Sequence, residues 1–276
     1  MTYFQNNTRN SKCAIFVASR AYALANSRTR LICHFINNGW QIVTISNQDT
    51  HSLILSNLGA TVESLNVQRG GIKFVSDFLT LLHLRELYKK YNPRLIHHFH
   101  AKPVILGNLA APNKSSVQII NTITGLGYAF TNNKCDQMIA LLGYRIALKK
   151  SAMTIFQNSA NQELFLKNNL LVRKKTRLIV SSGVDVQKYQ PKNEKKADDS
   201  KKTKILFASR LLISKGVREF LQAAKILSKK YDHVLFQIAG EWDEVHPDAI
   251  GREEILIADK NGFVDFLGYV ELDKQL

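Results

Sequence analysis

The sequence is short of cysteine, glycine and proline, and each shortage disfavours a class of protein. Three cysteines in 276 residues, Cys13, Cys33 and Cys135, are an odd number without the spacing of a zinc site. A disulfide framework and a zinc site are therefore disfavoured, and reduced, buried thiols are expected. With 14 glycines and 5 prolines, the chain is neither collagen-like nor of low complexity.

Long apolar runs are also missing. The longest apolar stretches are short ones such as Cys13 to Ala18, whereas a helix that spans a bilayer needs roughly 20 apolar residues. Residues 1–10 are polar and lack the apolar core of a signal peptide. These observations predict a cytoplasmic protein.

Acidic residues are too few to balance the basic ones. There are 38 lysines and arginines against 22 aspartates and glutamates, which gives a net charge of +16. Such a surplus indicates an anionic partner, which can be nucleic acid, an acidic membrane surface or a phosphate-rich substrate. Part of the surplus lies in the polar run 192–204, which reads as a solvated linker.

Strand and helix patterns alternate along the chain, which predicts the α/β class. From Lys12 to Val180 the alternation is typical of βαβ units around a doubly wound parallel sheet. It restarts at Lys204 and stops at Leu276. We expect an N-terminal Rossmann-like domain at 1–190 and a basic linker at 191–203. A partial C-terminal Rossmann-like domain is expected at 204–276. Because domains commonly hold about 100 to 150 residues, we interpret the chain as a fragment or a naturally shortened form.

In open parallel sheets, ligands bind at the carboxyl ends of strands. The sharpest candidate is Ala208 to Gly216, where a predicted strand ends and Arg210 follows at once. Ser214 is predicted to cap a helix that begins at Lys215. Two cations and a helix N-terminus suit a diphosphate. The alternative is a solvated loop with two ordinary surface cations.

A second candidate follows the predicted strand 94–99. His100 is a possible hydrogen-bond donor or base, and Lys102 a possible contact for an anion. The alternative is a capped loop, and at least one of His97 and His98 is expected in the core. No Asp, Glu or Cys stands at ligand spacing, so a metal is disfavoured.

Two further loops follow predicted strands. Gly125 and Gly127 permit a tight loop, and Tyr128 offers an aromatic surface on which a sugar or lipid can pack. On sequence alone, a loop that tucks its aromatic residues into the core is favoured. The loop 181–185 (SSGVD) predicts a structural turn, which Asp185 would cap.

Several blocks of this sequence resemble glycosyltransferase family 4, and most closely the bacterial branch that builds O-antigen, capsule or lipid-linked oligosaccharides. In the second half they are RLLISKGVREFLQAAKIL, FQIAGEWDEVHPDAI and VDFLGYV. In the first half they are FHAKPVILGNLAA, INTITGLGYAFT, IFQNSANQELF and SSGVDVQKYQP, in the family's order. The resemblance covers nearly the whole chain.

The resemblance implies a GT-B fold of two Rossmann-like domains, the second of them incomplete here. It implies a nucleotide-sugar donor, usually UDP-linked, whose sugar is transferred with retention of configuration and without a metal cofactor. The branch that the sequence resembles suggests a HexNAc as that sugar. Arg210 and Lys215 would contact the donor diphosphate and stabilise the leaving group, with Gly216 and Gly240 in the same donor site.

On the acceptor side, the resemblance implies an undecaprenyl-diphosphate-linked sugar or growing glycan, met at the anionic inner face of the plasma membrane. His100 would take part in catalysis. The acceptor would be bound by Lys102, Gly125, Gly127 and Tyr128.

The sequence departs from the family in two respects. The family continues into an EGxP segment with two glutamates spaced E-x7-E, which hold the ribose and the donor sugar, and this chain ends before it. The family also often has threonine at the place of His100, acidic residues at those of Ala160 and Asn161, and glycine at that of Ser181.

Two other functions stay open. The first is a non-catalytic module or partner subunit that binds a membrane surface or glycan. The second, nucleic-acid binding, depends only on the charge of +16 and ranks last, because the basic residues are not interleaved with aromatic ones.

Overall fold

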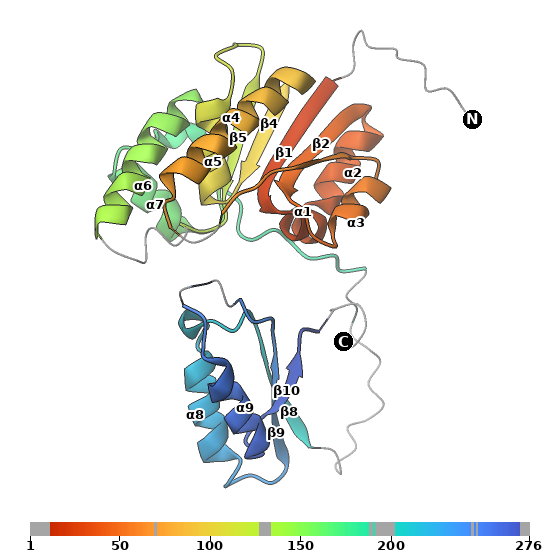
Figure 1. Cartoon of the computed structure of the whole chain (residues 1–276), viewed down its shortest axis with the longest axis vertical. Coiled ribbons are helices and arrows are strands. Elements are labelled where there is room, and N and C mark those ends of the chain that lie inside the picture. Colours follow the sequence, from red (N-terminus) through yellow and green to blue (C-terminus); the bar gives the residue numbers. More distant parts are fainter. Residues whose placement is uncertain are drawn as a thin grey trace, which may run out of the picture. The chain divides into compact units, whose positions relative to one another are not determined.

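The computed structural model describes residues 12–68, 71–126, 134–187, 190, 202–243, 246 and 248–270. The chain divides into two compact units, Met1–Asp185 and Val186–Leu276, each described here by itself (Figure 1). Most of the predicted linker, residues 191–201, lies outside the described residues.

The first unit contains a seven-stranded parallel sheet with the order β3-β2-β1-β4-β5-β6-β7. Its strands are β1 (Lys12–Arg20), β2 (Trp40–Asn47), β3 (Thr61–Ser64), β4 (Leu95–Phe99), β5 (Gln118–Ile123), β6 (Met153–Phe156) and β7 (Thr176–Leu178). Its α-helices are α1 (Ala21–Ser27), α2 (Thr29–Asn37), α3 (Ser52–Asn57), α4 (Phe74–Tyr91), α5 (Ala101–Ala110), α6 (Lys134–Ala147) and α7 (Ser159–Lys167).

Strand β1 is buried in the core, and both of its faces are covered. Residues 13–18 are all buried, and Ala14 is aligned with Ile42 of β2 on one side and Leu95 of β4 on the other. A strand buried on both faces reads as a continuous apolar run rather than an alternating one. This is why the run Cys13 to Ala18 predicted the strand correctly.

Helices cover both faces of this sheet. One apolar cluster joins the sheet to α1, α2 and α3 through residues such as Leu24, Ile32 and Leu55. On the opposite face, Leu84 and Tyr88 of α4 pack with Ala110 of α5. Figure 1 shows these two groups of helices on either side of the strands. The doubly wound arrangement expected from the sequence is confirmed.

The predicted helix 26–38 is wrong in one respect. The structure has two helices here, α1 and α2, which meet at Arg28. Helix α1 follows β1 directly, without a side-chain cap, and is held by the burial of Ala21, Leu24 and Ala25. Because tertiary packing rather than a local cap stabilises α1, no residue near Arg20 marks its start.

Both strand histidines belong to the core. The His98 imidazole lies 2.9 Å from the Tyr88 hydroxyl and 2.9 Å from Asn121 Oδ1. His97 Nε2 lies 2.8 Å from the Thr122 hydroxyl. A Cβ atom on Gly107 would come within 2.3 Å of the His98 ring, so the close packing of α5 requires glycine there. These contacts support the prediction of a core histidine at this strand.

The second unit contains a three-stranded parallel sheet with the order β10-β9-β8. Its elements are β8 (Thr203–Ala208), α8 (Val217–Leu227), β9 (Val234–Ala239), α9 (Arg252–Lys260) and β10 (Asp265–Gly268). The helices share one apolar cluster with the strands, built on Val217, Phe236, Ile238 and Ile255. The sequence therefore predicted the second parallel sheet correctly.

The cysteines differ partly from expectation. All three are free, and Cys13 is buried, but Cys33 is half-buried and Cys135 is exposed at the start of α6. The prediction of buried thiols is therefore wrong for Cys135. Among the helices within the described residues, none has the length and apolar character to cross a bilayer.

Candidate functional site

The loop after β8 is fixed by hydrogen bonds to neighbouring loops of its own unit. The backbone N–H of Ile213 donates to the Asp248 carbonyl (2.9 Å), and that of Ser214 donates to the Asp248 carboxylate (3.0 Å). The N–H of Ile250 donates to the Leu211 carbonyl (3.1 Å). The two hydrogen bonds from Ser214 hold the pKa of Asp248 below its ordinary value. The loop is thus a defined structure, not a free connection.

The start of the following helix differs from the prediction. Ser214 lies inside a short 3-10 turn, Ile213–Lys215, and α8 begins at Val217 after Gly216. No side chain caps α8, so the expected Ser214 cap is wrong. Gly216 adopts a left-handed conformation, with φ of 83°, which glycine reaches without steric cost. The turn needs this glycine to redirect the chain into the helix.

Arg210 and Lys215, the two predicted diphosphate contacts, both lie on this loop. Arg210 Nη1 is 3.8 Å from the Asp243 carboxylate, and the arginine side chain is 49% exposed. Asp243 is nearly buried, so it restrains the guanidinium while leaving much of it accessible. In the part of the chain that the structure describes, the Lys215 ammonium has no hydrogen bond or ion pair. Both cations are therefore accessible to an anion at the carboxyl end of β8.

Gly240 packs against this loop. It follows β9, and its N–H donates to the Gly268 carbonyl (2.8 Å). A Cβ atom on Gly240 would lie 2.0 Å from the Ser209 carbonyl oxygen, which is backbone and has little freedom to move. Glycine is therefore required sterically next to Arg210.

Replacing Gly240 with alanine is expected to displace the Arg210 loop and lower the unfolding temperature by several degrees, because overpacking costs about 1 to 3 kcal/mol. Circular dichroism melting and titration with UDP would measure both effects. Gly262→Ala is the control for stability alone, because Gly262 has no atom within 4 Å of its Cβ position but has positive φ. UDP binding reduced equally by both changes would contradict this account.

In the first unit, His100 lies directly after β4 in a strained conformation. Its φ is 71°, a region that non-glycine residues rarely adopt and that is often found at functional sites. The Ser19 N–H donates to His100 Nδ1 (3.3 Å). Burial and the neighbouring Arg28 lower the pKa of His100 to about 4. The neutral ring therefore carries its proton on Nε2, which makes it a hydrogen-bond donor rather than a base at that nitrogen.

Lys102 is anchored within the first unit. Its ammonium lies 2.7 Å from Asp77 Oδ1 and joins α5 to α4. Gly125 is near the end of β5, and no atom of the described residues lies within 4 Å of its Cβ position, so these residues do not require glycine there. Gly127 and Tyr128, the other two predicted acceptor residues, lie outside the described residues. Of the residues predicted in this unit, His100, predicted as catalytic, and Lys102, predicted to bind the acceptor, are thus the two with defined partners.

Arg28 was not identified from the sequence. Its guanidinium stacks 4.8 Å from the centre of the Phe99 ring, burial lowers its pKa, and its charge lowers the pKa of both His97 and His100. Arg28 lies between α1 and α2 and does not follow a strand, so the carboxyl ends of the predicted strands gave no indication of it. It places a half-buried cation beside His100.

The turn 181–185 joins two parts of the first unit. Asp185, which the sequence predicts to cap this turn, forms an ion pair with Arg30 (2.6 Å). Ser181 has φ of 65°, a conformation that favours glycine. A glycine at this position, as the resemblance implies, would adopt this conformation without strain.

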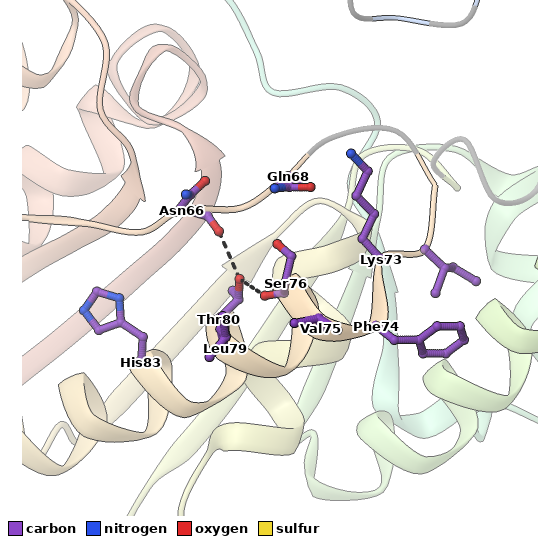
Figure 2. A pocket seen from close by; sticks show the side chains of 10 residues that line it. Asn66, Gln68, Lys73, Phe74, Val75, Ser76, Leu79, Thr80 and His83 are labelled. Carbon is purple, nitrogen blue, oxygen red and sulfur yellow. Dashed lines mark hydrogen bonds between the residues drawn. The ribbon is translucent and has the colours of Figure 1, made fainter.

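A groove of about 810 Å³ runs along the first turns of α4. Its lining is mixed, with Asn66, Gln68 and Lys73 beside Val75 and Leu79. Figure 2 shows the Thr80 hydroxyl, which donates hydrogen bonds to the backbone carbonyls of Asn66 (3.0 Å) and Ser76 (2.8 Å) in this groove. Across the described residues, no group of three or more His, Cys, Asp or Glu side chains is placed to hold a metal.

Each unit is a parallel sheet with helices, and polar loops follow the carboxyl ends of its strands, as expected for the GT-B fold class. The family model described as "Glycosyl transferase 4-like" matches residues 14–159. The chain belongs to this family, and both the predicted family and the predicted fold class are confirmed.

Among curated proteins, the chain is 28% identical over 242 residues to N,N'-diacetylbacillosaminyl-diphospho-undecaprenol alpha-1,3-N-acetylgalactosaminyltransferase of Campylobacter jejuni, covering 83% of the chain and 62% of that protein. It is 25% identical over 163 residues to UDP-Gal:alpha-D-GlcNAc-diphosphoundecaprenol alpha-1,3-galactosyltransferase of Escherichia coli, covering 56% of the chain and 42% of that protein. The chain thus spans less than two thirds of the length of either relative.

Solved structures share the fold. Sucrose-phosphate synthase from Thermosynechococcus elongatus aligns with a TM-score of 0.66 and 18% identity, over 94% of this chain and 71% of that one. Anabaena HepE in complex with UDP and glucose aligns with a TM-score of 0.64 and 15% identity, over 94% and 70%.

Proposed function

We propose that the chain acts as a retaining glycosyltransferase that moves a HexNAc from a UDP-sugar to a lipid-linked acceptor in the assembly of a cell-surface glycan. The observation that carries the proposal is the pair of accessible cations, Arg210 and Lys215, on a hydrogen-bonded loop at the carboxyl end of β8. A departing nucleoside diphosphate needs positive charge where its negative charge develops. Two cations on a fixed loop can supply that charge without a metal cofactor.

The donor chemistry is supported by the relatives. The names of both relatives describe transfer of a galactose-type sugar to a diphospho-undecaprenol-linked acceptor, and one of these names specifies a UDP-linked donor. HepE, which shares the fold, was solved with UDP and glucose. These likenesses favour a UDP-sugar donor, with UDP-GalNAc as the first choice because the relative with more coverage uses an N-acetylgalactosaminyl group.

The first unit is proposed to bind the acceptor at the carboxyl edge of its sheet. His100 would donate a hydrogen bond from Nε2 to an acceptor oxygen, and the half-buried Arg28 beside it would attract a phosphate. A lipid-linked acceptor requires a peripheral position on the inner face of the plasma membrane, where the net charge of +16 would favour anionic lipid.

The test is a donor screen on the whole chain. UDP-GalNAc, UDP-GlcNAc, UDP-galactose and UDP-glucose are each incubated with a synthetic polyprenyl-diphosphate-linked sugar in detergent, and the products are identified by mass spectrometry. One donor is expected to give a product with retained configuration, equally with and without EDTA. Loss of the product in EDTA would refute metal independence, and absence of both product and UDP binding would refute the donor site.

A non-catalytic binding module is the second candidate, and one feature favours it. Ile205 and Leu206 in the edge strand β8 are 40% and 44% exposed, so the donor-side sheet is poorly covered within its own unit. Binding of the lipid-linked sugar without UDP binding, measured by calorimetry in detergent, would support this candidate over the transferase.

A further inference from the structure

Two helices of the first unit present apolar side chains to solvent. On α4 the exposed fractions are 74% for Phe74, 77% for Val75, 60% for Phe78 and 60% for Leu79. A helix on the surface of a globular protein normally turns a polar face outward. The opposite side of α4 is also apolar, because Leu84 and Leu87 are buried in the core. The outer stripe is therefore not needed for folding.

Helix α6 carries a second stripe of the same kind. Met138 is 66% exposed, Leu142 57% and Ile146 49%, and their spacing of four residues places them along one side of the helix. Helix α5 packs between α4 and α6, with a Gly143 Cβ position only 3.3 Å from Ile105. The two stripes therefore belong to one layer of helices on the same face of the sheet.

This layer is also basic. Within residues 73–91 and 134–150, eight lysines and arginines stand against three acidic residues. One of those three, Asp77, is neutralised by Lys102 at 2.7 Å. Lys73 directly precedes α4, Lys134 is the first residue of α6, and both are exposed. Lys89, Lys90, Lys149 and Lys150 lie at the other ends of these helices. Apolar side chains with basic residues around them match the interface of an anionic bilayer, where apolar groups insert and cations meet lipid phosphates.

Both stripes begin at the carboxyl edge of the sheet. Helix α4 follows β3 and α6 follows β5, so both begin at the carboxyl edge of the parallel sheet. His100 lies at the same edge, after β4. In Figure 2, the Phe74 ring extends outward from the first turn of α4, beside Lys73.

We propose that the outer stripes of α4 and α6, centred on Phe74, Phe78, Met138 and Leu142, insert into the interface of an anionic membrane and turn the His100 edge toward it. The inference deepens the proposed function, because a lipid-linked acceptor is met at a bilayer. Its test needs no transfer activity, so the failure of one is distinguishable from the failure of the other.

The experiment is co-sedimentation of the whole chain with phosphatidylcholine vesicles, with and without phosphatidylglycerol. The unchanged chain should bind the anionic vesicles, and Phe74→Ser with Phe78→Ser should weaken this binding by roughly 10-fold or more. Leu53→Ser with Ile54→Ser is the matched control, because these side chains are 71% and 44% exposed on α3, on the opposite face of the sheet. The control should bind like the unchanged chain.

A second readout uses the exposed Cys135 at the start of α6. With Cys33 changed to serine, an environment-sensitive fluorophore on Cys135 should shift to the blue when anionic vesicles are added. The proposal is overturned by absent vesicle binding, by equal loss in both variant pairs, or by an unshifted probe. It is also overturned if Phe74→Ser with Phe78→Ser changes the oligomeric state in sedimentation velocity but leaves vesicle binding intact, since that result would identify a protein interface.

Discussion

Replacing Arg210 with alanine is expected to lower the rate of sugar transfer by roughly 100- to 1,000-fold, the loss typical when one preorganised donor to a developing anion is removed. The guanidinium is held near Asp243 at 3.8 Å yet is 49% exposed, so it is both positioned and accessible. Arg210→Lys keeps the charge but loses the planar fork of donors, and should recover only part of the rate. Steady-state rates and UDP titration measure both variants.

Lys215→Ala should produce a loss in the same direction, since its ammonium lies on the same loop. Lys225→Ala is the matched control: it removes one lysine from the last turn of α8, at the opposite end of that helix, and should leave the rate within about twofold. Circular dichroism melting shows whether each variant remains folded. A folded Arg210→Ala protein with unchanged rate and unchanged UDP affinity would remove the basis of the proposed donor site.

Acid is expected to destabilise the first unit strongly between pH 6.5 and about 4. Burial lowers the pKa of His97 to about 3 and that of His98 to about 4, from an ordinary value of 6.5. Below pH 6.5 the histidines of the unfolded chain are protonated, whereas the buried rings of the folded chain stay neutral. The free energy of unfolding therefore falls as the pH falls toward the folded-state pKa. Above pH 6.5 both states are neutral and the effect disappears. For His98 alone the loss is on the order of 3 kcal/mol.

Urea unfolding at pH 7.5, 6 and 5 measures this effect, with Trp242→Phe leaving Trp40 of β2 as the reporter for the first unit. His98→Gln should be less stable at pH 7.5, because the hydrogen bonds to Tyr88 and Asn121 are disturbed. Its loss of stability toward pH 5 should nevertheless be smaller. His34→Gln on the exposed side of α2 is the control. An identical pH dependence in His98→Gln and the unchanged chain would contradict the assignment.

The loop after β8 was predicted correctly in its position but not in its local conformation. The position of Arg210 and Lys215 followed from the order of a strand, a cation and a helix, because the carboxyl ends of parallel strands fix where loops lie. The cap at Ser214 did not follow correctly. Gly216 takes a left-handed conformation and a 3-10 turn precedes α8, and local propensity does not distinguish this turn from a capped helix.

The acceptor side was less accessible to prediction. His100 was found because it follows a strand, but its hydrogen bond from Ser19 joins residues 81 positions apart in the chain. The ion pair between Lys102 and Asp77 and the stacking of Arg28 on Phe99 likewise join distant segments. No spacing rule relates such partners, since only folding brings them together.

The sequence by itself determined the order of the strands, most of the helices, the two parallel sheets, the family and the position of Arg210 and Lys215 directly after a strand. These follow from periodicity, from buried apolar runs and from short ordered motifs, all of which are local in the chain. Only the tertiary structure decided which polar groups are neutral, paired or accessible, and that α4 and α6 leave apolar stripes uncovered. The physical reason is that burial and pairing depend on what packs against a side chain, and that neighbour lies far away in the sequence.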